Sequence, residues 1–286
     1  MTSLPGNAEA IEAWNTVLFD KFLQYRPLVV TALEPFGTRA IAKLNLRPGM
    51  SVVDIGCGFG ETTQQLGALV GPSGRAVGVD AAARFIDVGR RESEGVPQVR
   101  FEVADVEAGV PGGPYDAAFS RMGVMFFNQP VIALRNIRKA LAPGAMLSVC
   151  VWRKKDANEA MYAAEHLVRE ILGDPPKNDQ VTCGPGPFSM ASPDLVSDQL
   201  IGAGYTDIAF ERADGELMIG QTIEDAIDFA LTLGPAGEVV RLAGAEGVRR
   251  RAEIEASLRT MVEGFAKPGG VFAPASTWIV TARAPG

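Results

Sequence analysis

The chain has 286 residues, of which 47% are hydrophobic and 21% charged, with a net charge of −7 at neutral pH. This length and apolar share suffice for one large α/β domain with an insertion, or for two small domains. The acidic balance and the lack of a basic block argue against a nucleic-acid-binding surface. The three cysteines, Cys57, Cys150 and Cys183, form no paired motif, so neither a disulfide framework nor a metal site is expected.

The N-terminal region is predicted to be helical. Apolar residues recur there at helical spacing, namely Ile11, Trp14, Leu18, Phe22 and Tyr25. Pro27 divides the region, and a second helix is expected over residues 28–44. The start of the chain shows no charged segment followed by an apolar run, and no apolar stretch has the length of a membrane span. We therefore expect a cytoplasmic protein without a signal peptide or membrane span.

Residues 52–63 carry the most informative motif. They read Val-Val-Asp-Ile-Gly-Cys-Gly-Phe-Gly-Glu-Thr-Thr, which predicts a buried strand, a glycine turn and the start of a helix. Glycine allows backbone conformations closed to other residues and lets a ligand approach bare main chain. This arrangement predicts a nucleotide-type site at the end of a parallel strand.

The spacing of the glycines separates classes of nucleotide site. A dinucleotide-binding motif would place its third glycine at position 61, which is Glu61, and the Gly-Lys-Ser/Thr ending of a P-loop is absent. Asp54 and Glu61 would repel a phosphate. They suit a ligand that carries positive charge, such as one with an ammonium and a sulfonium group.

Further strands are predicted over residues 75–80, 99–105, 115–120 and 145–151. Asp80 ends the first of these and Asp105 the second. Because the carboxyl ends of parallel strands meet at one edge of an open sheet, both acids are expected beside the glycine turn. A carboxylate at position 80 can accept both ribose hydroxyls, and one at position 105 can accept a bond from an adenine amino group.

Residues 52–63 resemble motif I of the class I S-adenosylmethionine-dependent methyltransferases. The stretches 120–130 and 134–144 resemble the branch of that family near the ubiquinone and menaquinone biosynthesis methyltransferases. The resemblance covers about residues 10–155 well and the remainder loosely. It implies S-adenosylmethionine as cofactor and an α/β fold: a doubly wound, seven-stranded Rossmann-like sheet whose last strand is antiparallel and lies between strands five and six.

The resemblance also implies a division of the chain. Residues 1–48 would form an N-terminal helical lid and residues 49–155 the cofactor-binding core. Residues 156–204 and 213–268 would form an inserted helical substrate cap, while 205–212 and 269–286 would supply the closing strands of the sheet. A proline- and glycine-rich stretch over residues 173–190 is expected to be a loop.

By the same resemblance, Gly56, Gly58 and Gly60 would approach the methionine part of the cofactor. The complete set of expected cofactor contacts is Trp14, Tyr25, Asp54, Gly56, Cys57, Gly58, Gly60, Asp80, Ala81, Ala104, Asp105, Val106, Ser120, Arg121 and Met125. The expected acceptor contacts are Met122, Phe126, Trp152, Phe188 and Met190. For Asp54 the alternative is that it orients the glycine turn, and for Trp14 and Tyr25 that they are packing residues.

Methyl transfer from a sulfonium needs little besides positioning of the nucleophile, and a general base only when the acceptor must lose a proton. The lone histidine, His166, and Arg121 are the catalytic candidates. His166 is alternatively a surface or packing residue. Arg121 could bind an acidic acceptor, or alternatively pair with a local acid or with backbone carbonyls.

The predicted function is transfer of a methyl group to a small hydrophobic or aromatic acceptor, most simply at oxygen. Methylation of carbon or nitrogen in a small metabolite is the first alternative. A nicotinamide-dependent oxidoreductase is disfavoured by Glu61 and by the lack of a Tyr-x-x-x-Lys motif. A non-catalytic cofactor-binding protein is a further alternative. The sequence is compatible with a homodimer.

Overall fold

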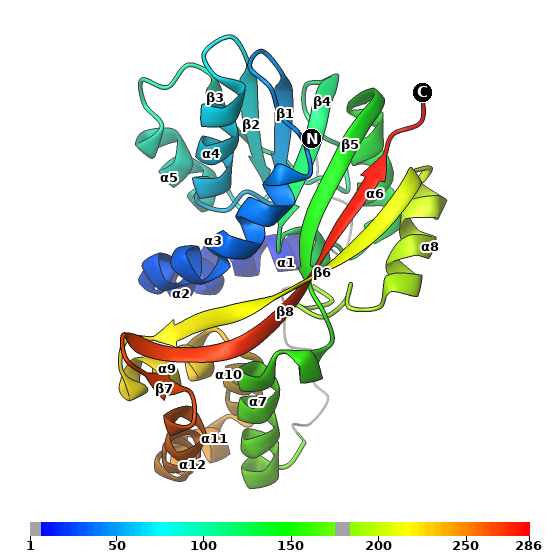
Figure 1. The fold of residues 1–286 in the computed structure, drawn as a ribbon. Helices are drawn as coiled ribbons and strands as arrows, with labels where there is room; N and C mark the ends of the chain where they lie inside the picture. Colours follow the sequence, from blue (N-terminus) through cyan, green and yellow to red (C-terminus); the bar gives the residue numbers. More distant parts are fainter. Residues whose placement is uncertain (1–6, 175–183) are drawn as a thin grey trace.

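A twisted mixed sheet organises the chain (Figure 1). The computed structural model describes residues 7–174 and 184–286. Five parallel strands come first in the chain, in the order β3-β2-β1-β4-β5, and β8 and β6 follow at the edge. β8 is antiparallel to both β5 and β6, which confirms the predicted sheet with a reversed last strand between the fifth and the sixth. The strands are β1 Ser51–Ile55, β2 Arg75–Asp80, β3 Val99–Val103, β4 Tyr115–Arg121, β5 Leu141–Trp152, β6 Thr206–Gly220, β7 Ala266–Lys267 and β8 Gly270–Arg283.

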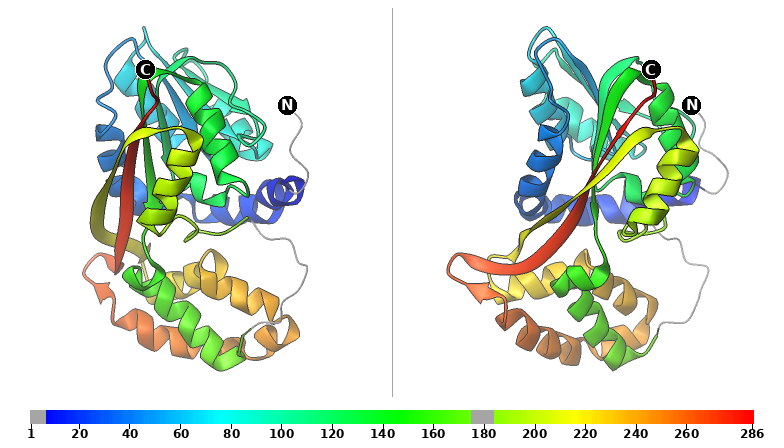
Figure 2. Two further views of the ribbon diagram at one scale, coloured as in Figure 1. Left: turned by 90° about the vertical axis from the view of Figure 1, so that its right-hand side faces the viewer. Right: turned by 45° about the vertical axis from the view of Figure 1, so that its right-hand side comes forward.

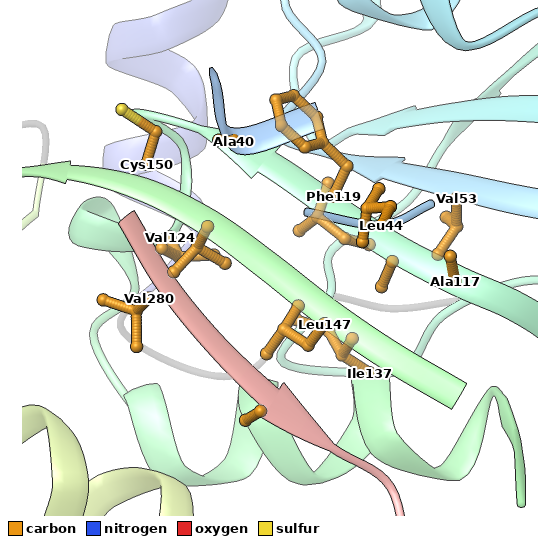
Figure 3. Close-up of a cluster of buried hydrophobic side chains, with 14 of the residues drawn as sticks. Ala40, Leu44, Val53, Ala117, Phe119, Val124, Ile137, Leu147, Cys150 and Val280 are labelled. Carbon is orange, nitrogen blue, oxygen red and sulfur yellow. The ribbon is translucent and has the colours of Figure 1, made fainter. Parts of the chain in front are cut away.

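Helices cover both faces of this sheet. α3 (Arg26–Ala42) and α4 (Glu61–Val70) lie on one side, and α6 (Pro130–Lys139) and α8 (Pro193–Ala203) on the other (Figure 2, right). α5 (Ala83–Glu92) packs on β2 and β3. Apolar side chains of helices and strands meet in a buried core, where Figure 3 shows Phe119 of β4, Leu147 of β5 and Ile137 of α6. Burial on both faces explains the continuous apolar runs in the inner strands β1 and β2, whereas the edge strand β3 alternates buried and exposed residues.

Strands β6 and β8 extend beyond the sheet and carry a helical cap (Figure 1). We expected β6 to end at Arg212, but it continues to Gly220, so residues 213–220 belong to a strand and not to the cap. The extension is stable because it pairs with β8 through Gly220 and Val271, where Ala273 and Ala275 are buried. The cap helices are α7 Glu159–Leu172, α9 Ile223–Thr232, α10 Pro235–Leu242, α11 Ala245–Arg249 and α12 Arg251–Glu263.

The cap has an apolar core of its own. Val168 of α7, Ile227 of α9, and Ile254 and Leu258 of α12 are buried there, apart from the core of the sheet. The loop predicted over 173–190 falls partly on residues 175–183, which lie outside the described residues.

The N-terminal helices lie between the sheet and the cap (Figure 1). They comprise α1 Ala8–Ala13, a π-helical turn at Trp14–Leu18, and α2 Phe19–Gln24. Phe19 packs edge-on against Phe59 and Phe85 of the core. Tyr25 packs on Phe229 of the cap helix α9 and hydrogen-bonds Asp228. This segment therefore contacts both parts of the protein.

The ring of Phe101 on β3 is surrounded by glycines. A Cβ atom added to Gly60, Gly78 or Gly89 would lie 2.4, 2.7 or 2.8 Å, respectively, from the nearest atom of this ring. We expect Gly89→Ala in α5 to destabilise the fold by about 1–3 kcal/mol through overpacking, although alanine is the better helix former by about 0.5–1 kcal/mol. The free energy of urea unfolding measures this change.

The control is the same substitution in a Phe101→Leu background, where the ring that blocks the new methyl group is gone. There Gly89→Ala should be neutral or stabilising. An equal cost in both backgrounds would show that the ring is not the cause.

Candidate functional site

A cavity of about 1380 Å³ opens at the carboxyl edge of the parallel strands, between the sheet, the N-terminal helices and the cap. Sites for single small ligands usually measure about 300–1,000 Å³, so this cavity has room for two. It brings together most of the residues predicted from the sequence: Trp14, Gly56, Cys57, Gly58, Asp80, Ala81, Ala104, Asp105, Val106, Arg121, Met122, Met125, Phe126 and Trp152.

The glycine turn presents bare main chain to the cavity. Gly56 and Gly58 have φ angles of +65° and +55°, a region that other residues adopt only with strain. The amides of Gly56 and Cys57 donate to the carbonyl of Val79, at 2.8 and 3.2 Å. A Cβ at position 56 would lie 2.9 Å from the Cα of Gly123, so the turn is held between β2 and the loop after β4.

Asp80 is fixed by the same turn. One carboxylate oxygen accepts from the amide of Gly58 at 3.0 Å and the other from the amide of Ala82 at 2.9 Å. Burial raises the pKa of this carboxyl above its usual range, an effect that these two amide bonds oppose. Each oxygen has a second lone pair, so the carboxylate can still accept a pair of ligand hydroxyls.

Asp105 also has acceptor capacity left. Its Oδ1 accepts from the amide of Glu107 at 2.9 Å, and its buried Oδ2 has no hydrogen-bond partner. A buried, unsatisfied carboxylate oxygen is costly, which makes this atom a good acceptor for a ligand amino group.

Asp54, Gly60 and Ser120, three of the predicted cofactor contacts, do not line the cavity. Asp54 is buried behind the turn, where its Oδ2 accepts from the hydroxyls of Thr62 and Thr63 at 2.6 and 2.7 Å. Burial raises its pKa to about 6. The hydroxyl of Ser120 donates to the carbonyl of Ile55 at 2.7 Å. The structure thus favours the alternative for Asp54, in which it orients the turn and the start of α4.

His166, the predicted catalytic base, lies outside the cavity lining, a position that favours its alternative as a surface residue. Its side chain is 59% exposed, lies 3.3 Å from Glu170 and stacks on Tyr162. The residues of α7 that line the cavity include Met161, Ala164 and Glu165, on a different face of the helix.

Tyr25, Phe188 and Met190 also lie outside the cavity lining. Tyr25 joins the N-terminal helices to the cap, as described above. Met190 is 3% exposed within the core of the sheet, and Phe188 packs against that core. The two predicted acceptor contacts Phe188 and Met190 thus lie outside this lining.

The sequence prediction missed several polar groups of the lining, Glu107 among them, and most of the apolar wall. Glu107 lines the cavity, accepts from the amide of Asn128 at 2.7 Å and is buried, which raises its pKa. Its position two residues after Asp105, just beyond the end of β3, could have indicated that it lies at the same edge of the sheet. The missed apolar residues come from α3, β6 and the cap, and include Leu33, Leu217, Ile219, Phe229, Leu233, Met261 and Val262.

The strand order, the reversed β8 and the acids Asp80 and Asp105, at or just beyond the ends of β2 and β3, agree with the fold that the sequence motifs predict. Residues 52–144 match a family described as "Methyltransferase domain". A solved structure, the YcgJ protein of Bacillus subtilis, has a TM-score of 0.55 and 15% identity to this chain, over 88% of this chain and 99% of that one.

Two curated relatives with similar sequences are also methyltransferases. The trans-aconitate 2-methyltransferase of Azoarcus sp. (strain BH72) is 26% identical over 73% of this chain and 72% of its own length. The ubiquinone/menaquinone biosynthesis C-methyltransferase UbiE of Hahella chejuensis is 34% identical over 40% of this chain, which spans 47% of that relative. The α/β core thus matches a methyltransferase domain and is similar in sequence to two S-adenosylmethionine-dependent methyltransferases, in agreement with the motifs.

Within 7–174 and 184–286, no helix is both long and apolar enough to cross a membrane. In the same ranges, no group of three or more histidine, cysteine, aspartate or glutamate side chains is placed to hold a metal ion.

Proposed function

We propose that the protein transfers a methyl group from S-adenosylmethionine to a small-molecule acceptor bound under the helical cap. The observation that carries the proposal is the pairing of Asp80 with the glycine turn at the edge of a cavity large enough for two ligands. The match of residues 52–144 to a methyltransferase domain supports it.

The proposed cofactor position uses three features of the cavity. The methionine part would lie over the bare main chain of Gly56 and Gly58, and Asp80 would accept the ribose hydroxyls. The free Oδ2 of Asp105 would accept from the adenine amino group. Trp14, which packs on Phe126 at a centroid distance of 5.0 Å, would close this part of the cavity as a lid residue.

The proposed reaction is an in-line displacement. A lone pair of the acceptor attacks the methyl carbon while the carbon–sulfur bond breaks, and the sulfur leaves with that electron pair as a neutral thioether. Holding the two ligands at attack distance supplies most of the acceleration. The apolar wall formed by α3, β6 and the cap supports a hydrophobic acceptor. Oxygen is our proposed acceptor atom, with carbon and nitrogen as the alternatives.

Isothermal titration of the purified chain with S-adenosylhomocysteine tests the cofactor class, with NADH as control ligand. We expect binding of S-adenosylhomocysteine alone. Preference for NADH, or no binding of either ligand, would refute the proposed function. A positive result justifies a screen of acceptors under the same conditions.

A further inference from the structure

The cavity has two chemically different parts. Main-chain atoms of the glycine turn and the acids after β2 and β3 form one part, which the proposed cofactor position occupies. The other part is enclosed by apolar side chains of α3, β6, β8 and the cap helices, among them Leu33, Leu217, Phe229 and Met261. A ligand in this second part would be largely surrounded by hydrocarbon.

Arg121 stands on the boundary between these parts. It is the last residue of β4 and lines the cavity. Its side chain runs toward α3, because its Cδ lies 2.9 Å from the place where a Cβ of Gly37 would be. A glycine inside a helix costs about 0.5–1 kcal/mol relative to alanine. At position 37 it leaves space for the arginine chain.

Among the described residues, the guanidinium of Arg121 makes neither a hydrogen bond nor an ion pair, and burial lowers its pKa. The acids Asp54, Glu61 and Glu34 attract it only from a distance. A desolvated arginine without a partner is costly, and such a group facing a cavity is a candidate ligand contact.

The other arginines of the cavity lining are already matched by acids. Arg26 lies 2.5 Å from Glu61, Arg169 lies 3.0 Å from Glu165, and Arg241 lies 2.7 Å from Glu238. Lys21 of α2 also lines the cavity and has no ion pair among the described residues, but it belongs to the N-terminal helices. Among the described arginines that line the cavity, Arg121 is thus the one without an acid partner.

We propose that Arg121 binds a carboxylate of the acceptor, so that the acceptor is an apolar carboxylic acid with its hydrocarbon body under the cap. This inference rests on the proposed function. The planar guanidinium presents paired N–H donors that match the two oxygens of a carboxylate. The cofactor carries a carboxylate too, on its methionine part. We assign Arg121 to the acceptor because its side chain is directed toward α3, whose Leu33 belongs to the apolar wall.

The test compares each acid with its uncharged amide. Octanoate and octanamide, and 4-phenylbutyrate and 4-phenylbutyramide, are titrated calorimetrically into the full chain, with and without saturating S-adenosylhomocysteine. We expect the wild type to bind each acid at least about tenfold more tightly than its amide, the scale of a charge-assisted hydrogen bond. In Arg121→Met this preference should disappear, while the affinity for S-adenosylhomocysteine stays unchanged.

Two further variants make the result specific. Arg121→Lys keeps the charge but not the paired donors, so it should retain part of the preference and shows the effect even if Arg121→Met folds poorly. Lys21→Met removes the other unpaired cation and should leave the preference intact. Loss of the preference in Lys21→Met, with retention in Arg121→Met, would overturn the assignment.

The remaining outcomes are distinguishable. A loss of S-adenosylhomocysteine affinity in Arg121→Met, with the acid preference intact, would assign the arginine to the cofactor carboxylate and overturn the proposal. Equal binding of acids and amides by the wild type, or binding of neither, would also overturn it. Failure of the wild type to bind S-adenosylhomocysteine would instead refute the proposed function, because that measurement does not depend on an acceptor.

Discussion

Replacing Asp80 by alanine is expected to weaken the binding of S-adenosylhomocysteine by about 1–3 kcal/mol, or roughly 5- to 150-fold. Two sets of hydrogen bonds would be lost. The variant has no acceptor for the ribose hydroxyls, and the amides of Gly58 and Ala82 lose the carboxylate that fixes them. Calorimetric titration of the wild type and the variant measures the difference.

Two variants make this measurement specific. Asp80→Asn keeps one acceptor oxygen and should fall between the wild type and Asp80→Ala. Glu102→Ala removes an exposed acid from the neighbouring strand β3, outside the cavity lining, and should bind like the wild type. If Asp80→Ala folded normally and bound S-adenosylhomocysteine with unchanged affinity, the ribose contact would have to be abandoned.

The pH dependence of binding gives a second readout of Asp80. Because its pKa is raised by burial, this carboxylate takes up a proton at a higher pH than an ordinary aspartate does. A protonated carboxyl accepts fewer hydrogen bonds, so the contribution of Asp80 to ligand affinity should fall as the pH is lowered. In Asp80→Asn this part of the pH dependence should be absent.

The part of the cavity that we propose for the cofactor was predictable because its signals are local. Short apolar runs mark the parallel strands, and each run ends in a residue whose position at the sheet edge follows from the topology alone. Asp80 and Asp105 needed no knowledge of distant contacts. Their expected position beside the glycine turn agrees with the cavity lining.

The acceptor half was not predictable, because its residues meet only through the tertiary fold. The extension of β6 past Arg212 includes Asp214, Gly215 and Glu216, which are poor strand formers, and it is stabilised by pairing with β8 about sixty residues later in the chain. That pairing decides that Leu217 faces the cavity. Phe188 and Met190 are hydrophobic, but hydrophobicity does not distinguish a cavity wall from the core that buries Met190.

His166 illustrates a different difficulty. Its residue type suits general base catalysis, and the helix that carries it does border the cavity. The apolar stripe of a helix decides which of its faces is buried against the rest of the protein. In α7 the buried residues are Ala164, Glu165 and Val168, so His166 lies outside the buried face. The exposed position of His166 beside Tyr162 follows from that stripe, which is a better guide than chemical reactivity.

The charge on Asp54 is expected to make the protein less stable as the pH rises from about 4 to 7. The pKa of this carboxyl is about 6 in the folded protein, against an ordinary value of 3.8. Between these two values the folded state binds more protons than the unfolded state, so the free energy of unfolding falls with increasing pH. The stabilisation is complete below the lower pKa, is lost as the pH passes through the higher one, and amounts to about 3 kcal/mol.

The measurement is the difference in unfolding free energy between the wild type and Asp54→Asn, from urea titrations at several pH values between 4 and 7. Asparagine can still accept from Thr62 and Thr63 but carries no charge, so contributions from all other groups cancel in the difference. The variant should gain about 3 kcal/mol relative to the wild type across this range. A difference that does not change with pH would show that Asp54 is not a buried, ionising group.

Thr62→Val provides the matched control, because it removes one of the two hydroxyl donors that stabilise the ionised form. The pKa of Asp54 should then rise further, and the loss of stability should extend above pH 6. At neutral pH the buried, ionised Asp54 thus lowers the stability of the fold. We infer that its role is to fix the geometry of the glycine turn. The two threonines that Asp54 holds begin α4, the helix entered directly from the turn at the edge of the proposed cofactor site.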